Sequence, residues 1–119
     1  MGDNQGCASS ILRGRRPIMA LLDLLGQKWA LRVLWELRDG AMSSRALRSA
    51  AGDISPTVLQ SRIHELRDAG IVERVDGGYS LTPLGLELSE AFMPLYRFAG
   101  KWADCLETRL IEQPGSLHQ

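Results

Sequence analysis

The sequence has few of the residues that build metal sites and catalytic sites. It contains two cysteines, Cys7 and Cys105, and two histidines among 119 residues, with no C-x-x-C pair. A zinc site or a disulfide framework is therefore not expected. No nucleophile, base and orienting residue occur at a recognisable spacing, and no glycine-rich phosphate loop is present. We predict that the protein is not an enzyme and uses no metal or cofactor.

Long hydrophobic runs are also missing. The apolar stretches are short and interrupted by charge, so we expect no bilayer-spanning segment, and the N-terminus lacks the apolar stretch of a signal peptide. With 45% hydrophobic and 24% charged residues, the chain fits one small globular domain. We expect a cytoplasmic protein with one domain over 17–112, a flexible tail at 1–16 and a C-terminal tail at 113–119.

An excess of charge of one sign is absent, since 14 basic residues balance 14 acidic ones. This balance counts against a nucleic-acid-binding protein, which more often has a basic excess. The charges are graded along the chain, however. Residues 1–39 hold six basic and four acidic groups, whereas residues 83–119 hold three and five. The distribution therefore permits a basic face.

The stretch from Ser55 to Ala69 predicts a helix with two different faces. Ser55 suits the N-cap, Pro56 suits the first turn, and Gly70 ends the helix. Apolar residues recur at helical spacing and predict a buried stripe made of Leu59, Ile63 and Leu66. The other face carries polar side chains of the kind that read base edges, namely Thr57, Gln60, Ser61 and His64. An ordinary solvated face is the alternative interpretation of this pattern.

The segments around this helix favour the DNA-binding interpretation. A short helix at 43–50 and a turn at 51–54 precede it, which is the order of a helix-turn-helix. Residues 71–75, 76–78 and 79–82 then read as strand, turn and strand, a β-hairpin in the place of a wing.

Flanking helices complete the predicted fold. Residues 17–25 are apolar nearly all round. Residues 28–38 should form a supporting helix that buries Trp29, Val33, Leu34 and Leu37. Thr82 and Pro83 start a helix that should kink or restart near Pro94. A long apolar stripe then runs through Leu95, Phe98, Trp102 and Leu106. We expect this stripe, with Leu21 and Leu24, to form a homodimer interface, and packing within one chain is the alternative.

From about Pro17 to about Leu106, the chain resembles the HxlR-type winged helix-turn-helix regulators of bacteria, within the MarR-like superfamily. The resemblance rests on five segments in order: Leu25-Gly26-Gln27-Lys28-Trp29, Ile54 to Leu59 with Arg62 and Leu66, Ala69 to Arg74, Tyr79 to Thr82 with Gly85, and Pro94-Leu95 with Trp102. It implies a mainly α-helical winged helix-turn-helix with a small β-hairpin, a core at 28–82 and dimerisation helices at 17–25 and 83–112.

The resemblance also implies a transcriptional regulator whose helix 55–69 enters the major groove of a pseudo-palindromic operator. On the matching positions we assign Ser55 and Arg62 to phosphate, Thr57, Gln60, Ser61 and His64 to base edges, and Arg45 and Arg48 to the backbone as clamps. Arg74 would serve the wing, whose acidic tip at Asp76 repels phosphate.

Four departures from the family pattern are informative. The largest is the wing, because family wings are commonly longer and carry an arginine shortly before the tyrosine, where this chain has Asp76-Gly77-Gly78. Arg16 stands where many members have the cysteine of a Cys-Pro pair, so thiol sensing by that route is in doubt, and Cys7 lies in a tail. Gln27 replaces the second glycine of Gly-Gly-Lys-Trp. Ser44 replaces an aromatic residue.

Two further alternatives remain open from the sequence. The neutral charge and the acidic wing tip also fit a winged-helix module that binds protein and not DNA. A small-molecule effector is a candidate partner if aromatic side chains line a pocket, namely Trp29, Trp35, Phe98 and Trp102. Core packing explains these residues without a ligand and is the interpretation that we prefer.

Overall fold

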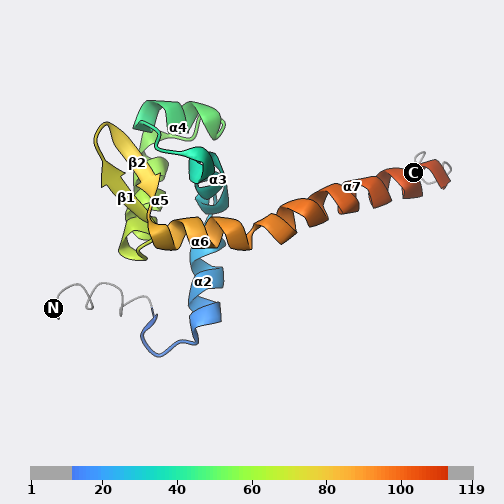
Figure 1. Cartoon of the computed structure of the whole chain (residues 1–119), viewed down its shortest axis with the longest axis horizontal. Coiled ribbons are helices and arrows are strands. Elements are labelled where there is room, and N and C mark those ends of the chain that lie inside the picture. The colour runs from blue at the N-terminus through green and yellow to red at the C-terminus, as the bar shows by residue number, and fades with distance from the viewer. Residues whose placement is uncertain (1–11, 113–119) are drawn as a thin grey trace. The chain divides into compact units, whose positions relative to one another are not determined.

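The computed structural model describes residues 12–112, so the predictions for Cys7 and for the tail at 113–119 lie outside the described residues. The elements follow one another as α2 (Pro17–Leu25), α3 (Ala30–Glu36), the 3-10 turn η1 (Leu37–Asp39), α4 (Ser44–Ala50), α5 (Pro56–Asp68), β1 (Val72–Val75), β2 (Gly78–Leu81), α6 (Pro83–Ala91) and α7 (Met93–Glu112) (Figure 1). This is the mainly helical fold with one hairpin that the sequence predicts.

The core lies where α3, α4, α5 and the hairpin meet. The predicted stripe of α5 is confirmed, because Leu59, Ile63 and Leu66 are all at most 1% exposed. Val33 of α3 and Leu47 of α4 are each 0% exposed. Burying such side chains contributes about 1.5–3 kcal/mol each, so these contacts hold α5 firmly against α3 and α4.

The helix-turn-helix forms from α4, the turn at 51–55 and α5. Ser43 caps α4 by accepting from the Ala46 amide at 3.1 Å, and Ser55 caps α5 by accepting from the Val58 amide at 3.2 Å. Between them, Asp53 has a φ of 60°, a left-handed conformation that aspartate tolerates better than most residues. The two caps and this turn fix the angle at which α5 leaves α4.

The wing is an antiparallel hairpin in which Val72 pairs with Leu81 and Val75 with Gly78. Met42 adds a short bridge to Tyr79, with both backbone hydrogen bonds made, at 3.0 and 2.9 Å. The turn is therefore Asp76-Gly77, shorter than the predicted 76–78, because Gly78 already belongs to β2. A Cβ at Gly78 would collide with the Met42 carbonyl oxygen, so the bridge requires glycine there.

Helix α3 begins later than predicted. Trp29 has a φ of 79° and lies outside the helix, which starts at Ala30 and not at Lys28. Trp29 is half-buried, so the prediction that it is core is wrong, while Val33, Leu34 and Leu37 are buried as predicted. A left-handed residue cannot continue a right-handed helix, which explains the late start.

After the wing, the predicted cap of α6 is confirmed, because Thr82 Oγ1 accepts from the Gly85 amide at 3.0 Å. The predicted restart is also found: α6 ends at Ala91 and α7 begins at Met93, with Pro94 in its first turn. The chain divides into two compact units, 1–89 and 90–119, which we describe separately. The boundary between the two units falls near the end of α6, within the range 17–112 that we predict as one domain.

The tail expected at 1–16 reaches the described residues at its C-terminal end. Here Arg15 forms an ion pair with Asp23 of α2, so the last part of that segment is attached to the first helix. Among the helices of residues 12–112, none is both long and apolar enough to cross a lipid bilayer.

Candidate nucleic-acid interface

The polar face of α5 forms an open groove on the surface. Its lining is Pro56, Thr57, Gln60, Ser61 and His64, around a volume of about 510 Å³. Every one of these side chains is exposed, and none is acidic. The structure therefore brings together the four residues that the sequence assigns to base edges, on the side of α5 opposite its buried stripe.

Gln60 is held by two neighbours, Ser44 and Tyr79, that are not among the predicted site residues. Its Nε2 donates to Ser44 Oγ of α4 at 3.4 Å, and Tyr79 Oη of β2 donates to its Oε1 at 3.5 Å. Both hydrogen bonds are long and therefore weak. They orient the exposed amide while leaving it able to exchange these partners for the edge of a base.

A second groove joins the C-terminal half of α5 to the wing. It is lined by His64, Arg67, Asp68, Val72, Glu73 and Arg74, around about 510 Å³. Arg67 and Arg74 are exposed and supply positive charge, which Asp68 and Glu73 partly offset. His64 Nε2 lies 3.4 Å from the Asp68 carboxylate. Arg67, which the sequence places beside the polar face as a cation of the kind that holds phosphates, lies here on the same face as Gln60 and His64 and is a candidate phosphate contact.

The other predicted arginines lie in three different situations. Arg45 is exposed on α4, as a phosphate clamp requires. Arg48 is half-buried, and its Nε donates to the Ile54 carbonyl at 2.9 Å, so it also holds the turn of the helix-turn-helix. The side chain of Arg62 is only 15% exposed and lines neither groove, so it does not lie where a phosphate contact is expected.

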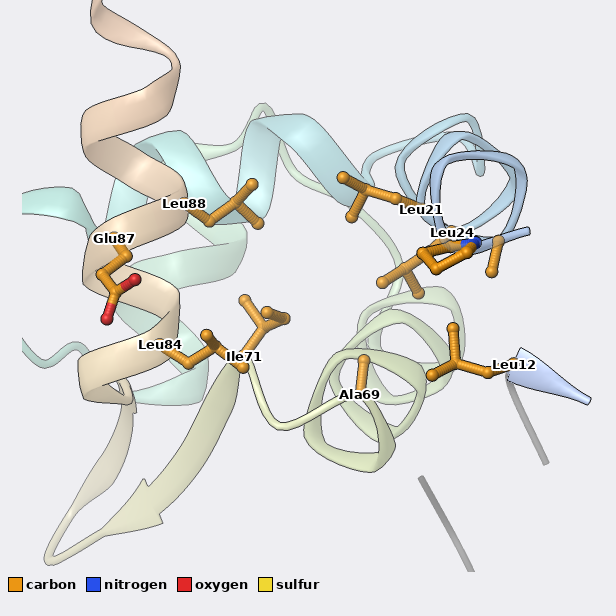
Figure 2. A pocket seen from close by; sticks show the side chains of 10 residues that line it. Leu12, Leu21, Leu24, Ala69, Ile71, Leu84, Glu87 and Leu88 are labelled. Carbon is orange, nitrogen blue, oxygen red and sulfur yellow. The ribbon is translucent and has the colours of Figure 1, made fainter. Parts of the chain in front are cut away.

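Two of the predicted dimer residues, Leu21 and Leu24, line an apolar pocket of about 440 Å³ (Figure 2). In Figure 2, their side chains face Leu84, Leu88 and Ile71 across the cavity. Glu87 is the one charged residue of the lining. Because almost the whole wall is aliphatic, the pocket favours apolar atoms.

The remaining predicted dimer residues lie on α7. Leu95, Phe98 and Trp102 are each 56% exposed, and Leu106 is half-buried. The lining of the apolar pocket includes none of the four aromatic residues considered for an effector site, namely Trp29, Trp35, Phe98 and Trp102. Trp35 instead lies under the Arg38 guanidinium, at 3.7 Å from the ring centre.

A core of three helices, a helix-turn-helix and a β-hairpin wing define a winged helix-turn-helix protein. Residues 24–107 match the family model of the HxlR-like helix-turn-helix. This match spans most of the chain, and the protein belongs to that family of transcriptional regulators.

Individual relatives agree with this assignment. The chain is 30% identical, over 74% of its length and 70% of the other, to the uncharacterised HTH-type transcriptional regulator sll1512 of Synechocystis sp.. It is similar to the crystal structure of a possible HxlR family transcriptional factor from Thermoplasma volcanium, with 32% identity, a TM-score of 0.66, and 75% and 86% of the two chains covered. Quinone-bound YodB of B. subtilis gives 29% identity, a TM-score of 0.61, and coverage of 73% and 94%. The first two relatives are described as a transcriptional regulator and a possible transcriptional factor.

Proposed function

We propose that this protein is a homodimeric, sequence-specific DNA-binding regulator that inserts α5 into the major groove of a pseudo-palindromic operator. The observation that carries the proposal is the exposed face of α5. Its N-terminal part, from Thr57 to His64, presents a row of polar side chains with no acidic residue in the groove that they line, on a helix whose opposite face is fixed in the core. An α-helix fits the major groove, where each base pair presents a distinct pattern of donors and acceptors.

Within this arrangement the contacts divide by chemistry. Thr57, Gln60, Ser61 and His64 reach base edges from the open groove of α5. Gln60 is the strongest candidate, because a glutamine amide pairs with adenine through two hydrogen bonds. Phosphate contacts come from the ends of the motif and from the wing, namely Ser55, Arg45, Arg48, Arg67 and Arg74.

Dimerisation is proposed from two apolar surfaces. The pocket that contains Leu21 and Leu24 is one, and the exposed stripe of α7 is the other. A second copy of the chain offers the same two surfaces, so a two-fold dimer covers both. Two-fold symmetry then predicts operator half-sites about 34 Å apart, or a multiple of that distance. We keep the pocket as the site where an unidentified small-molecule effector would bind.

The proposal is tested by fluorescence anisotropy of labelled duplexes across a salt series, after selection of tight binders from a random library. We expect enrichment of an inverted repeat and affinity that falls as salt rises, because phosphate contacts release counterions. No binding at low salt by a folded protein would favour the protein-interaction module, for which the structural relatives give no support.

The role of Gln60 is tested by Gln60→Ala. Loss of a bidentate base contact costs about 1–3 kcal/mol, so the ratio of operator to random-duplex affinity should fall by roughly 5- to 150-fold. Ser49→Ala, on an exposed side chain of α4 outside both grooves, is the control and should leave the ratio unchanged. Equal losses on both duplexes for Gln60→Ala would rule out base reading by this residue.

As a DNA-binding regulator, the protein is proposed to act in the cytoplasm.

A further inference from the structure

Arg62 and Arg67 lie on the same helix in contrasting surroundings. Arg67 is exposed and lines the second groove, between α5 and the wing. The Arg62 side chain is 15% exposed and turns toward the core side of α5. A phosphate ligand must extend into solvent to meet DNA. The position of Arg62 therefore calls for another role.

The Arg62 guanidinium contacts the turn between α2 and α3. Its Nη1 donates to Gln27 Oε1 at 3.1 Å, joining residues 35 positions apart. Arginine has only donors, so it is the amide oxygen of Gln27 that must face it. Among residues 12–112, this is the one side-chain hydrogen bond between that turn and α5. A glycine at position 27, as in the motif the chain resembles, would offer no such acceptor.

Glu65 holds the same guanidinium from the other side. Its Oε1 lies 3.5 Å from Arg62 Nε, an ion-pair distance, while that Nε is buried and makes no hydrogen bond in the described part of the chain. Glu65 and Gln27 both line a small groove between α2 and α5, of about 250 Å³. To reach a phosphate, Arg62 would have to abandon both partners and expose a carboxylate near the DNA.

We propose that Arg62 is a positioning residue. Its hydrogen bond to Gln27 fixes the position of α5 against the α2–α3 turn, and Arg62 makes no phosphate contact itself. The inference rests on the proposed DNA-binding function. Helix α2 carries Leu21 and Leu24 of the proposed dimer surface, and Gln27 follows it directly. In a dimer that reads two half-sites, the position of α5 relative to α2 determines where each recognition helix meets the major groove. The Arg62–Gln27 hydrogen bond thereby tunes operator recognition.

The test compares wild type with Arg62→Met, Gln27→Leu, their double variant, Gln27→Glu and Arg67→Met. Each is titrated with the selected inverted-repeat duplex and with a scrambled duplex across a salt series. Loss of one hydrogen bond predicts a roughly 5- to 10-fold weaker affinity of Arg62→Met and Gln27→Leu for the inverted repeat. We expect the scrambled duplex and the salt slope to be unaffected. The double variant should bind the inverted repeat no more weakly than either single variant. Gln27→Glu keeps an acceptor for Arg62, so it should retain the wild-type ratio of inverted-repeat to scrambled-duplex affinity.

Arg67→Met is the matched control for a phosphate contact. It should weaken both duplexes and reduce the salt slope by about one. The same behaviour from Arg62→Met would overturn the positioning role. So would independent losses from Arg62→Met and Gln27→Leu that multiply in the double variant, because residues that act through one contact are not additive.

Failure of the proposed function gives a different result. Wild-type protein would then bind neither duplex at low salt. A denaturation cycle on the same variants still decides the structural coupling without DNA. If the double variant raises the unfolding equilibrium constant by less than the product of the two single increases, the Arg62–Gln27 link is supported. An increase equal to that product overturns it.

Discussion

Helices α5 and α7 are both amphipathic, but only α5 has its apolar side covered. Leu59, Ile63 and Leu66 of α5 are at most 1% exposed, whereas Phe98 and Trp102 of α7 are each 56% exposed. The neighbours of α5 in the chain, α3, α4 and the wing, supply its cover. The aromatic stripe of α7 is exposed, and large exposed apolar surfaces mark interaction sites. The difference agrees with the proposed homodimer, in which a second copy of the chain covers this stripe.

The largest expected loss of stability comes from a substitution in the buried stripe of α5. Leu66→Ala removes a side chain that is 0% exposed, and such a cavity costs about 2–5 kcal/mol of the free energy of unfolding. Leu95→Ala, in the exposed stripe of α7, should cost less than about 0.5 kcal/mol. Urea denaturation at a concentration where the protein is monomeric measures both.

A loss from Leu95→Ala as large as that from Leu66→Ala would reverse the comparison. The stripe of α7 would then be packed within its own chain, the alternative that the sequence leaves open. A dimer interface through α7 would lose its main support.

The next effect concerns association. Trp102→Glu places a charge in the apolar stripe, and removing an aromatic residue at the centre of an interface costs about 2 kcal/mol or more. The dimer dissociation constant should therefore rise at least about 30-fold, as measured by sedimentation equilibrium. Lys101→Glu, beside it in sequence on an exposed position, changes charge without removing apolar surface and should leave the constant within about threefold. Equal effects from both would mean that charge, and not the stripe, controls association.

The same comparison shows what the sequence could predict. The helices, the wing and the two faces of α5 follow from periodicity, caps and turn residues, because each signal lies within a few positions. The bounds of α3 could not be predicted from such local signals, because Trp29 takes a left-handed conformation that tryptophan rarely adopts. Gly78 joins the sheet by pairing with Val75, and its neighbour Tyr79 bridges to Met42, which is far away in sequence.

The placement of Arg62 could have been found by geometry. At about 100° per residue, it lies about 140° around the helix from Thr57, and the buried Leu66 lies at about 180°. Its side chain therefore belongs to the border of the core and not to the centre of the polar face. Its partner Gln27 could not be found in this way, because the contact joins two segments that meet only in the folded chain.

The smallest expected effect distinguishes two roles of Ser55 at the start of α5, which are capping the helix and contacting a phosphate. Ser55 and Ser43 are matched caps, with Oγ to amide distances of 3.2 and 3.1 Å. Ser55→Ala and Ser43→Ala should each cost about 1 kcal/mol of unfolding free energy, measured by urea denaturation. Only Ser55 stands at the N-terminus of the proposed recognition helix, where a hydroxyl can also donate to phosphate.

Duplex titration of the two cap variants should therefore differ where denaturation does not. Ser55→Ala should weaken binding to the selected duplex by a few-fold more than Ser43→Ala, which is the loss of roughly one hydrogen bond. Equal binding by the two variants would assign Ser55 to capping alone. Phosphate contact at this end of α5 would then have to come from Arg45, which is exposed on α4.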